Sequence, residues 1–207
     1  MSDYLNQINP KRTNPVIESI LQEANMLGTP IIRIDAINFI IQLIKAANIK
    51  KVLEIGSAIG YSSIMIATFT DAEVITIEKN EENYKRALKN IRNAKLESKI
   101  KLILADANEY NLSEDDQFDL LFIDASKSSY IRFFEKYESH LNEHGIIITD
   151  NLLFHGFVES PESIISRNKK QLVRKINNFN EYIVNHPDYD TYIYQIGDGL
   201  SLSIRKV

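Results

Sequence analysis

The sequence predicts an α/β fold built on one mostly parallel, seven-stranded sheet. From Lys51 onward, apolar β-branched runs alternate with segments of helical periodicity, which is typical of strands joined by crossover helices. The last two apolar runs flank a Gly-Asp-Gly sequence at residues 197–199. They therefore predict an antiparallel hairpin at one edge of the sheet. Helices are expected before the first strand.

Two N-terminal helices are predicted from their end signals and periodicity. Asn14 and Pro15 fit the N-cap and first turn of a helix that reaches about Met26, and Gly-Thr-Pro at residues 28–30 ends it. A second helix is expected over residues 34–47. Its apolar residues recur on one face, at Ile37, Ile40, Ile41, Ile44 and Ala47.

The remaining elements follow in alternation. The predicted strands cover residues 52–55, 73–77, 101–104, 118–123 and 145–149, then 189–196 and 200–205 in the hairpin. The predicted helices cover residues 61–69, 80–94 with Asn80 as the N-cap, 130–141 and 170–184. No repeat or linker divides the chain, so we expect a single domain over residues 1–207. Residues 1–48 would form its N-terminal helical extension and residues 49–207 its core.

Composition limits the classes of protein and partner. The chain has 207 residues, of which 44% are apolar and 25% charged, as in a folded globular protein. The absence of cysteine excludes disulfides, thiolate zinc sites and cysteine nucleophiles. No secretory signal and no apolar run long enough to span a membrane occurs, so we expect a cytoplasmic protein without a membrane partner. With a net charge of −4, nucleic acid would need a local basic patch.

The turn after the first predicted strand is a candidate cofactor loop. Gly56 and Gly60 give a G-x-x-x-G spacing, and glycine lets a backbone approach a ligand closely. Glu78 ends the next strand, where its carboxylate can accept bonds from two ribose hydroxyls. Asp106 and Ala107 end the third strand and could frame an adenine edge. These features favour a nucleotide-like cofactor over a bare structural turn, although an NAD-type site also has an acid at the second strand.

Glu54, which precedes the cofactor loop, has two alternative roles. Its carboxylate could hydrogen-bond the amides of that loop, or it could reach an ammonium group on the cofactor.

Oxygen ligands follow two other strands. Asp124 comes after residues 120–123, and Asp150 and Asn151 come after residues 146–149. If the two strands are neighbours, these side chains converge at the carboxyl edge of the sheet, where such sheets bind ligands. Two carboxylates and an amide suit Mg²⁺ or another hard divalent cation. The alternative is that Asp150 and Asn151 only mark a turn.

Lys127 is the candidate catalytic base. It lies three residues after Asp124, and a lysine in a desolvated pocket beside a cation loses its proton more easily. The alternatives are that it orients the substrate or is an exposed lysine at a helix start. The cation would help a substrate hydroxyl to lose its proton, and an oxyanion attacks a methyl sulfonium far better than the neutral hydroxyl. His155 lines the substrate mouth or is a surface residue.

Three motifs resemble those of the cation-dependent O-methyltransferases, the family of caffeoyl-CoA and catechol O-methyltransferases. They are ExGxxxGYSS at residues 54–63, DAxKxxY at residues 124–130 and DNxLxxG at residues 150–156. The resemblance implies a Rossmann-like S-adenosylmethionine-dependent methyltransferase fold. It also implies that Ile32, Ser62 and Asp124 join the cofactor contacts, and that members often form homodimers. One departure is Ser126, where many members have a second acid, which leaves the substrate in doubt.

The C-terminal part of the chain resembles the branch of this family that methylates tRNA. That branch acts on 5-hydroxyuridine at the wobble position of the anticodon loop and forms 5-methoxyuridine. A basic segment without acids agrees with an RNA partner, and its charged residues are Arg167, Lys169, Lys170, Arg174 and Lys175. The 5-hydroxyl and 4-carbonyl oxygens of the base could chelate one metal, as a catechol does.

Three functions therefore remain open. The leading prediction is the Mg²⁺-dependent tRNA methyltransferase. The second is an O-methyltransferase of small catechols or caffeoyl-CoA, in which the basic segment is only a solvated helix face. The third is a non-catalytic module that binds RNA or the cofactor on the same fold.

Overall fold

A seven-stranded mixed sheet forms the centre of the molecule, in the order β3-β2-β1-β4-β5-β7-β6. The computed structural model describes residues 3–206, apart from the side chains of residues 3, 6 and 163. The strands are β1 (Lys51–Ile55), β2 (Glu73–Glu78), β3 (Ile100–Leu104), β4 (Phe118–Ile123), β5 (Leu141–Thr149), β6 (Tyr189–Tyr194) and β7 (Leu200–Arg205). The first five are parallel, and β7 pairs antiparallel with β5 and β6. The predicted α/β class and edge hairpin are confirmed.

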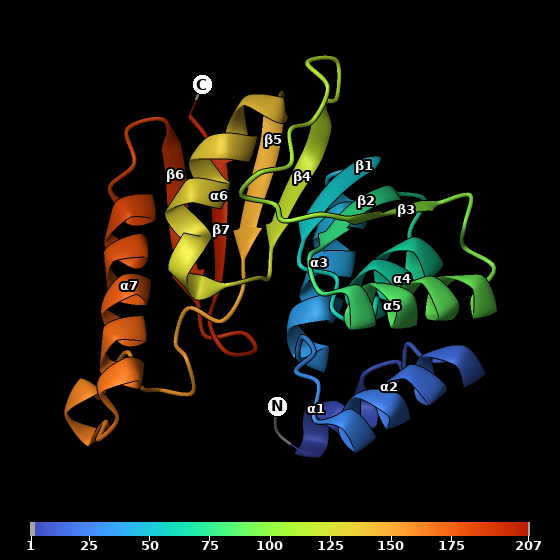
Figure 1. The fold of residues 1–207 in the computed structure, drawn as a ribbon, viewed down its shortest axis with the longest axis horizontal. Helices are drawn as coiled ribbons and strands as arrows, with labels where there is room; N and C mark the ends of the chain where they lie inside the picture. The colour runs from blue at the N-terminus through green and yellow to red at the C-terminus, as the bar shows by residue number, and fades with distance from the viewer. Residues whose placement is uncertain (1–2, 207) are drawn as a thin grey trace.

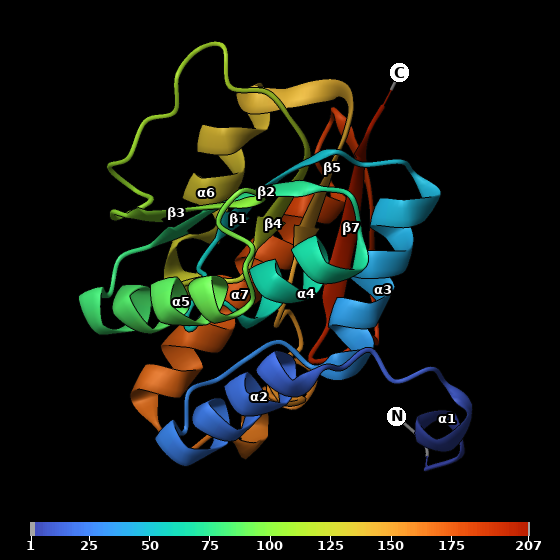
Figure 2. The same cartoon turned by 90° about the vertical axis from the view of Figure 1, so that its right-hand side faces the viewer.

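Helices cover both faces of this sheet (Figure 1). They are α1 (Asp3–Ile8), α2 (Pro15–Leu27), α3 (Ile34–Ala46), α4 (Tyr61–Phe69), α5 (Glu81–Asn93), α6 (Tyr130–Tyr137) and α7 (Arg167–Val184). Short 3-10 helices are Lys127–Ser129, Glu138–His140 and Pro161–Ser163. On one face α3, α4 and α5 pack on the sheet, and α2 forms an outer layer against α4 and α5 (Figure 2). On the other face α6 and α7 pack together.

Each face has its own hydrophobic cluster. Ile17 and Ile20 of α2 and Ile37 of α3 join strand residues in the first cluster, so the N-terminal helices are part of the same core. The second cluster is aromatic: Phe179 of α7 packs 5.1 Å from Tyr130 and 6.4 Å from Phe134, measured between ring centroids. Burial of such large side chains supplies the main stabilisation of helix against sheet.

The predicted end signals act as expected. The Asn14 side chain accepts a bond from the Ile17 amide at 2.9 Å, and Gly28 ends α2 in the left-handed conformation. Asn80 caps α5 in the same way, through the amide of Asn83.

Several boundaries differ from the prediction, and β6 ends at Tyr194 instead of residue 196. The helix expected to reach residue 141 ends earlier, because Leu141 pairs with Phe118 and starts β5 after the 3-10 helix that follows α6. A register irregularity then leaves residues 142–144 exposed. Helix α7 starts at Arg167, since Ser166 provides its N-cap, and α1 was not predicted.

No helix in the described part of the chain is long and apolar enough to cross a membrane.

Candidate active site

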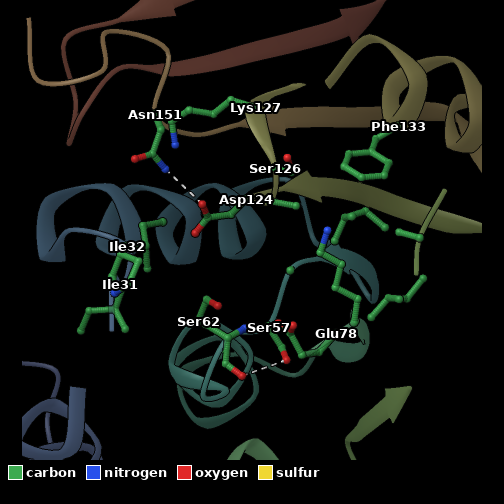
Figure 3. A pocket seen from close by; sticks show the side chains of 18 of the residues that line it. Ile31, Ile32, Ser57, Ser62, Glu78, Asp124, Ser126, Lys127, Phe133 and Asn151 are labelled. Carbon is green, nitrogen blue, oxygen red and sulfur yellow. Dashed lines mark hydrogen bonds between the residues drawn. The ribbon is translucent and has the colours of Figure 1, made fainter. Parts of the chain in front are cut away.

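A cavity of about 290 Å³ opens where the central parallel strands end. Its walls come from the loop between β1 and α4, the ends of β2, β3 and β4, and the segment before α3. Many predicted site residues line it, namely Ile32, Gly56, Ser62, Glu78, Asp106, Ala107, Asp124, Lys127 and Asn151. In Figure 3, Asn151 and Asp124 face each other near Lys127, whereas Glu78, Ser57 and Ser62 lie toward the opposite side. Glu54 and Asp150 are not among the lining residues.

Gly56 lets the cofactor loop pass directly beside the end of β4. Its φ is +98°, and a Cβ at this position would collide with the backbone carbonyl oxygen of Asp124. The Gly56 amide donates to the Ile77 carbonyl at 2.9 Å, and the Asp124 amide donates to the Ile55 carbonyl at 3.0 Å. The loop is therefore fastened to both neighbouring strands at a point where a side chain has no room.

Glu78 fixes the other side of this loop. One carboxylate oxygen accepts a bond from the Ala58 amide at 2.9 Å, and the other accepts from the Asn80 amide at 2.7 Å. A carboxylate has about four acceptor positions, so both oxygens can accept one more donor from the cavity. Glu78 can thus shape the loop and still bind the two hydroxyls of a ribose.

Glu54 does not bond the loop amides, which corrects one of its two predicted roles. It is fully buried behind the loop, where one oxygen accepts from the hydroxyls of Ser63 and Thr76, the second at 2.5 Å. Its Oε1 has no hydrogen-bond partner among the described residues. Burial raises the pKa of Glu54 to about 7, although hydrogen bonds from Ser62, Ser63 and Thr76 oppose this rise.

Asp106 follows the end of β3 and lines the cavity. Its Oδ1 accepts from the Asn108 amide at 2.9 Å and from the Asn108 side chain at 2.8 Å. These bonds lower the pKa of Asp106, so the carboxylate is ionised beside the neighbouring Ala107.

Asp124, Asp150 and Asn151 come together because β4 and β5 are adjacent. The Asn151 side chain donates to Asp124 Oδ1 at 3.0 Å, and its backbone amide donates to Asp150 Oδ1 at 2.7 Å. Burial raises the pKa of Asp124 to about 6. Burial, followed by the charge of Asp124, raises the pKa of Asp150 to about 7, and Asp198 adds a smaller contribution.

This donor set fits a hard divalent cation. Two carboxylates share a desolvated site in which their ionised forms repel, and a cation would offset both effects. In the structure the amide nitrogen of Asn151 bonds Asp124, and Asp150 lies behind the cavity wall with 3% of its surface exposed. No group of three or more His, Cys, Asp or Glu residues suited to a metal occurs within residues 3–206. A cation would therefore depend on the Asn151 oxygen, and the metal site stays a prediction.

Lys127 begins a 3-10 helix at the edge of the cavity. Its charge favours the ionised forms of both Asp124 and Asp150, which places the ammonium near the two acids. The ammonium also lies over the Phe154 ring, 5.5 Å from its centroid. The Lys127 side chain is half-buried, so it is partly desolvated and can still reach a molecule bound in the cavity.

The sequence analysis assigned no role to three residues around this site. The Tyr130 hydroxyl is buried and donates to the Asp150 carbonyl at 2.9 Å. Phe154 packs beside Lys127, and Asp198 reaches the same loop from the hairpin turn. Tyr130 is the last residue of the DAxKxxY motif, which is the signal that could have found it. No signal distinguished Phe154 from ordinary core residues, and Asp198 lies in a Gly-Asp-Gly turn.

The predicted basic residues all lie exposed on the N-terminal half of α7. Figure 1 shows this end of α7 at the same end of the molecule as the carboxyl ends of β4 and β5. Lys169 lies over the ring of Phe157, 5.2 Å from its centroid, in the segment that follows Asn151. The basic residues therefore do not enter the cavity but lie on the side of the molecule where it opens.

Comparison with known proteins gives a consistent family. Residues 14–206 match a family model described as O-methyltransferase. A caffeoyl-CoA O-methyltransferase of Populus kitakamiensis is 32% identical over 203 residues, which cover 91% of this chain and 83% of that protein. A crystal structure assigned to a caffeoyl-CoA O-methyltransferase of Staphylococcus aureus is 37% identical with a TM-score of 0.90, covering 99% of this chain and 96% of the other.

A Bacillus cereus O-methyltransferase, whose crystal structure is in complex with SAH, shares the fold. Its TM-score is 0.81 at 24% identity, and the match covers 98% of this chain and 96% of that protein.

Substitution of Gly56 by alanine should destabilise the protein by about 4 kcal/mol or more, because the added methyl meets backbone that cannot move aside. Gly28→Ala is the matched control. Its φ is also positive, +63°, but nothing lies within 4 Å of its Cβ position, so it should cost roughly 1–2 kcal/mol. Urea unfolding followed by circular dichroism measures both, and equal losses would contradict the steric argument.

The buried Glu54 carboxyl should make the unliganded protein less stable as pH rises. Its pKa is raised in the folded state, so the stabilisation is complete below about pH 4.5 and is lost as pH rises through about 7. The Glu54→Gln variant should therefore gain stability over the wild type at pH 8, on the order of 3 kcal/mol, and little at pH 4.

Thermal unfolding between pH 4 and pH 8 measures this difference. The control is Glu81→Gln, at an exposed carboxyl whose pKa is lowered by Lys85. The Glu81→Gln variant should lose as much stability between pH 4 and pH 8 as the wild type does. An unchanged loss of stability in Glu54→Gln would show that the Glu54 carboxyl is not responsible.

Proposed function

The chain belongs to the O-methyltransferase family, and from this membership we propose a specific reaction. It transfers the methyl group of S-adenosylmethionine to a hydroxyl of an aromatic substrate that carries a second oxygen beside it. A divalent cation, with Mg²⁺ as the leading candidate, assists the transfer.

One observation carries this proposal. Groups suited to a nucleoside and groups suited to a chelated substrate lie on opposite sides of one cavity. Ser57, Ser62 and Glu78 are on one side, and Asp124, Asn151 and Lys127 are on the other. A cofactor and a substrate bound at these two walls would be held close to each other, and direct transfer of a methyl group requires this proximity.

The residues present fit S-adenosylmethionine, which supplies an electrophilic methyl group on a sulfonium. The loop at Gly56 would lie against it, and Glu78 has acceptor positions left for its ribose. Asp106 and Ala107 would border its adenine, whereas Ile32 and Ser62 complete the wall. Apolar side chains such as Phe133 would keep water from the reacting atoms.

Asp124, Asp150 and Asn151 would hold the cation, which stabilises negative charge on the substrate oxygen. Lys127 acts on the proton. Its Nζ accepts the hydroxyl proton if it enters the reaction neutral, and it stabilises the developing negative charge if it stays an ammonium. Tyr130 donates its hydroxyl to the Asp150 carbonyl and so fixes the backbone between the two ligand candidates that follow β5.

The substrate class that the relatives support best is a small catechol-type molecule. The Populus relative is named for caffeoyl-CoA, and it matches this chain over 91% of its length. A catechol places its reacting hydroxyl next to a second oxygen, so both atoms could face the same cation.

A second substrate is supported by the surface of α7. Exposed Arg167, Lys170 and Arg174 lie on the side of the molecule where the cavity opens, as a site for the phosphates of RNA requires. The candidate is 5-hydroxyuridine at the wobble position of a tRNA anticodon loop. Bases in such loops can be splayed out of the stack and into a pocket.

Methyl transfer should depend strongly on Lys127 and Asp150. We expect Lys127→Ala and Asp150→Ala to lower the rate about a hundredfold or more, and a chelator to abolish it. The assay supplies labelled S-adenosylmethionine with either a catechol or tRNA that contains 5-hydroxyuridine, and mass spectrometry detects the methylated product. Lys89→Ala, at an exposed lysine of α5, is the control. A non-catalytic module would methylate neither substrate and would bind its partner equally well in all variants.

Charge reversal on α7 should separate the two substrates. In a tRNA enzyme, the triple variant Arg167→Glu, Lys170→Glu and Arg174→Glu should raise the KM for tRNA roughly tenfold or more and leave catechol turnover unchanged. The matched control reverses three exposed charges of α5, at Lys85, Lys89 and Arg92. Turnover of the catechol alone, with no effect of either triple variant, would rule out the tRNA substrate.

A further inference from the structure

The turn between β6 and β7 holds the loop that follows the metal-ligand candidates. The Leu152 amide donates to the Gly199 carbonyl at 2.9 Å, and the Leu153 amide donates to the Asp198 carbonyl at 2.8 Å. Asp198 then reaches further with its side chain, and Oδ1 accepts from the His155 amide at 2.6 Å. Asp198 thus binds this loop at two points, the amides of Leu153 and His155.

The loop needs such support because its backbone is unfavourable. Phe154 and His155 have φ values of +45° and +56°, and Gly156 follows at +78°. Side chains other than glycine rarely adopt this left-handed region, and each costs free energy that surrounding contacts must offset. A charge-assisted bond from a carboxylate to the amide of His155, in the middle of the left-handed run, supplies such a contact.

The position of the Phe154 ring depends on this bond, and the position of the Lys127 ammonium depends on the Phe154 ring. The Phe154 ring lies 5.5 Å from the Lys127 ammonium and packs against Phe157 at 5.9 Å between centroids. If the left-handed run relaxed, the ring would leave the ammonium and Lys127 would gain rotational freedom.

Asp198 itself is held rigidly. A Cβ at Gly197 would come within 2.9 Å of Ala36, and one at Gly199 within 2.6 Å of Leu153, so the turn is packed between α3 and the loop. The Gly197 amide also donates to an Asp35 carboxylate oxygen at 3.3 Å. The Asp198 side chain is 12% exposed, which limits its freedom to move away.

We propose that Asp198 is a positioning residue for Lys127, acting through the amide of His155 and the ring of Phe154. The catalytic role of Lys127 rests on the proposed function, whereas the mechanical link from Asp198 to Lys127 does not. The link runs through the backbone of His155 and not through its imidazole. The ring is 71% exposed and its Nδ1 lies 3.4 Å from Asp198 Oδ2, a contact of little strength for so exposed a ring.

Two measurements on the unliganded protein test this link without any methyl transfer. Hydrogen exchange by NMR should show the His155 amide protected in the wild type and in Asp198→Asn, which retains the acceptor oxygen. In Asp198→Ala the amide should exchange about tenfold faster or more. Acetylation by N-hydroxysuccinimidyl acetate, read by peptide mass spectrometry, should modify Lys127 faster in Asp198→Ala, with Lys89 as the internal standard.

Two further variants locate the link. His155→Ala removes the ring but keeps the amide, so Lys127 should be labelled at the wild-type rate. Phe154→Ala leaves the turn intact, so it should raise Lys127 labelling as much as Asp198→Ala does. It also replaces Asp198→Ala as the decisive variant if that protein does not fold. Unchanged Lys127 labelling in the folded variants of Asp198 and Phe154, or a His155→Ala variant that behaves like Asp198→Ala, would overturn the proposal.

Activity adds a final readout. With catechol, Mg²⁺ and S-adenosylmethionine, Asp198→Ala should lower kcat roughly tenfold or more and leave the KM for S-adenosylmethionine nearly unchanged. The Asp198→Asn variant should recover most of the rate. If Lys127→Ala is fully active the proposed function fails, but exchange and labelling still decide whether Asp198 holds Lys127.

Discussion

The contact between Gly56 and the backbone of Asp124 is the constraint on which the site depends. It brings the loop after β1 against the end of β4 at a distance that no side chain permits. Glu78 then holds the same loop from β2 through the Ala58 amide. The ends of β1, β2 and β4 are thereby held next to one another, and the residues at these ends line the cavity. A wider loop would separate the cofactor wall from the acids of β4 and β5 and remove the reason for their proximity.

The acids of this region are costly to bury, and that cost is informative. Glu54, Asp124 and Asp150 all have raised pKa values, because burial removes the water that would stabilise each ionised carboxylate. For Asp124 and Asp150, which also repel each other, Lys127 offsets part of the cost and a divalent cation would offset more. Glu54 differs, since it is fully buried behind the loop and its carboxylate accepts hydrogen bonds from the hydroxyls of Ser63 and Thr76. Its location indicates a structural carboxyl beneath the loop.

The two ends of the chain complete the site from outside the parallel core. The segment before α3 contributes Ile32 to the cavity, and the β6–β7 turn supports the loop after Asn151. The hairpin reaches the site because β7 pairs antiparallel with β5, which places the β6–β7 turn at the carboxyl end of β5. The basic half of α7 lies near the same end of the molecule.

The sequence by itself determined the class of fold and the order of the strands and helices from α2 onward, because these follow from local periodicity, caps and glycines. It placed the start of β5 four residues late, since the pairing of Leu141 with Phe118 is a long-range contact that no local pattern shows. Only the tertiary structure decided that Glu54 faces hydroxyls behind the loop and that Asp150 lies behind the wall. It alone revealed Asp198, whose partner His155 is 43 residues away. Side-chain direction and contacts between distant segments depend on packing, and packing is a property of the folded whole.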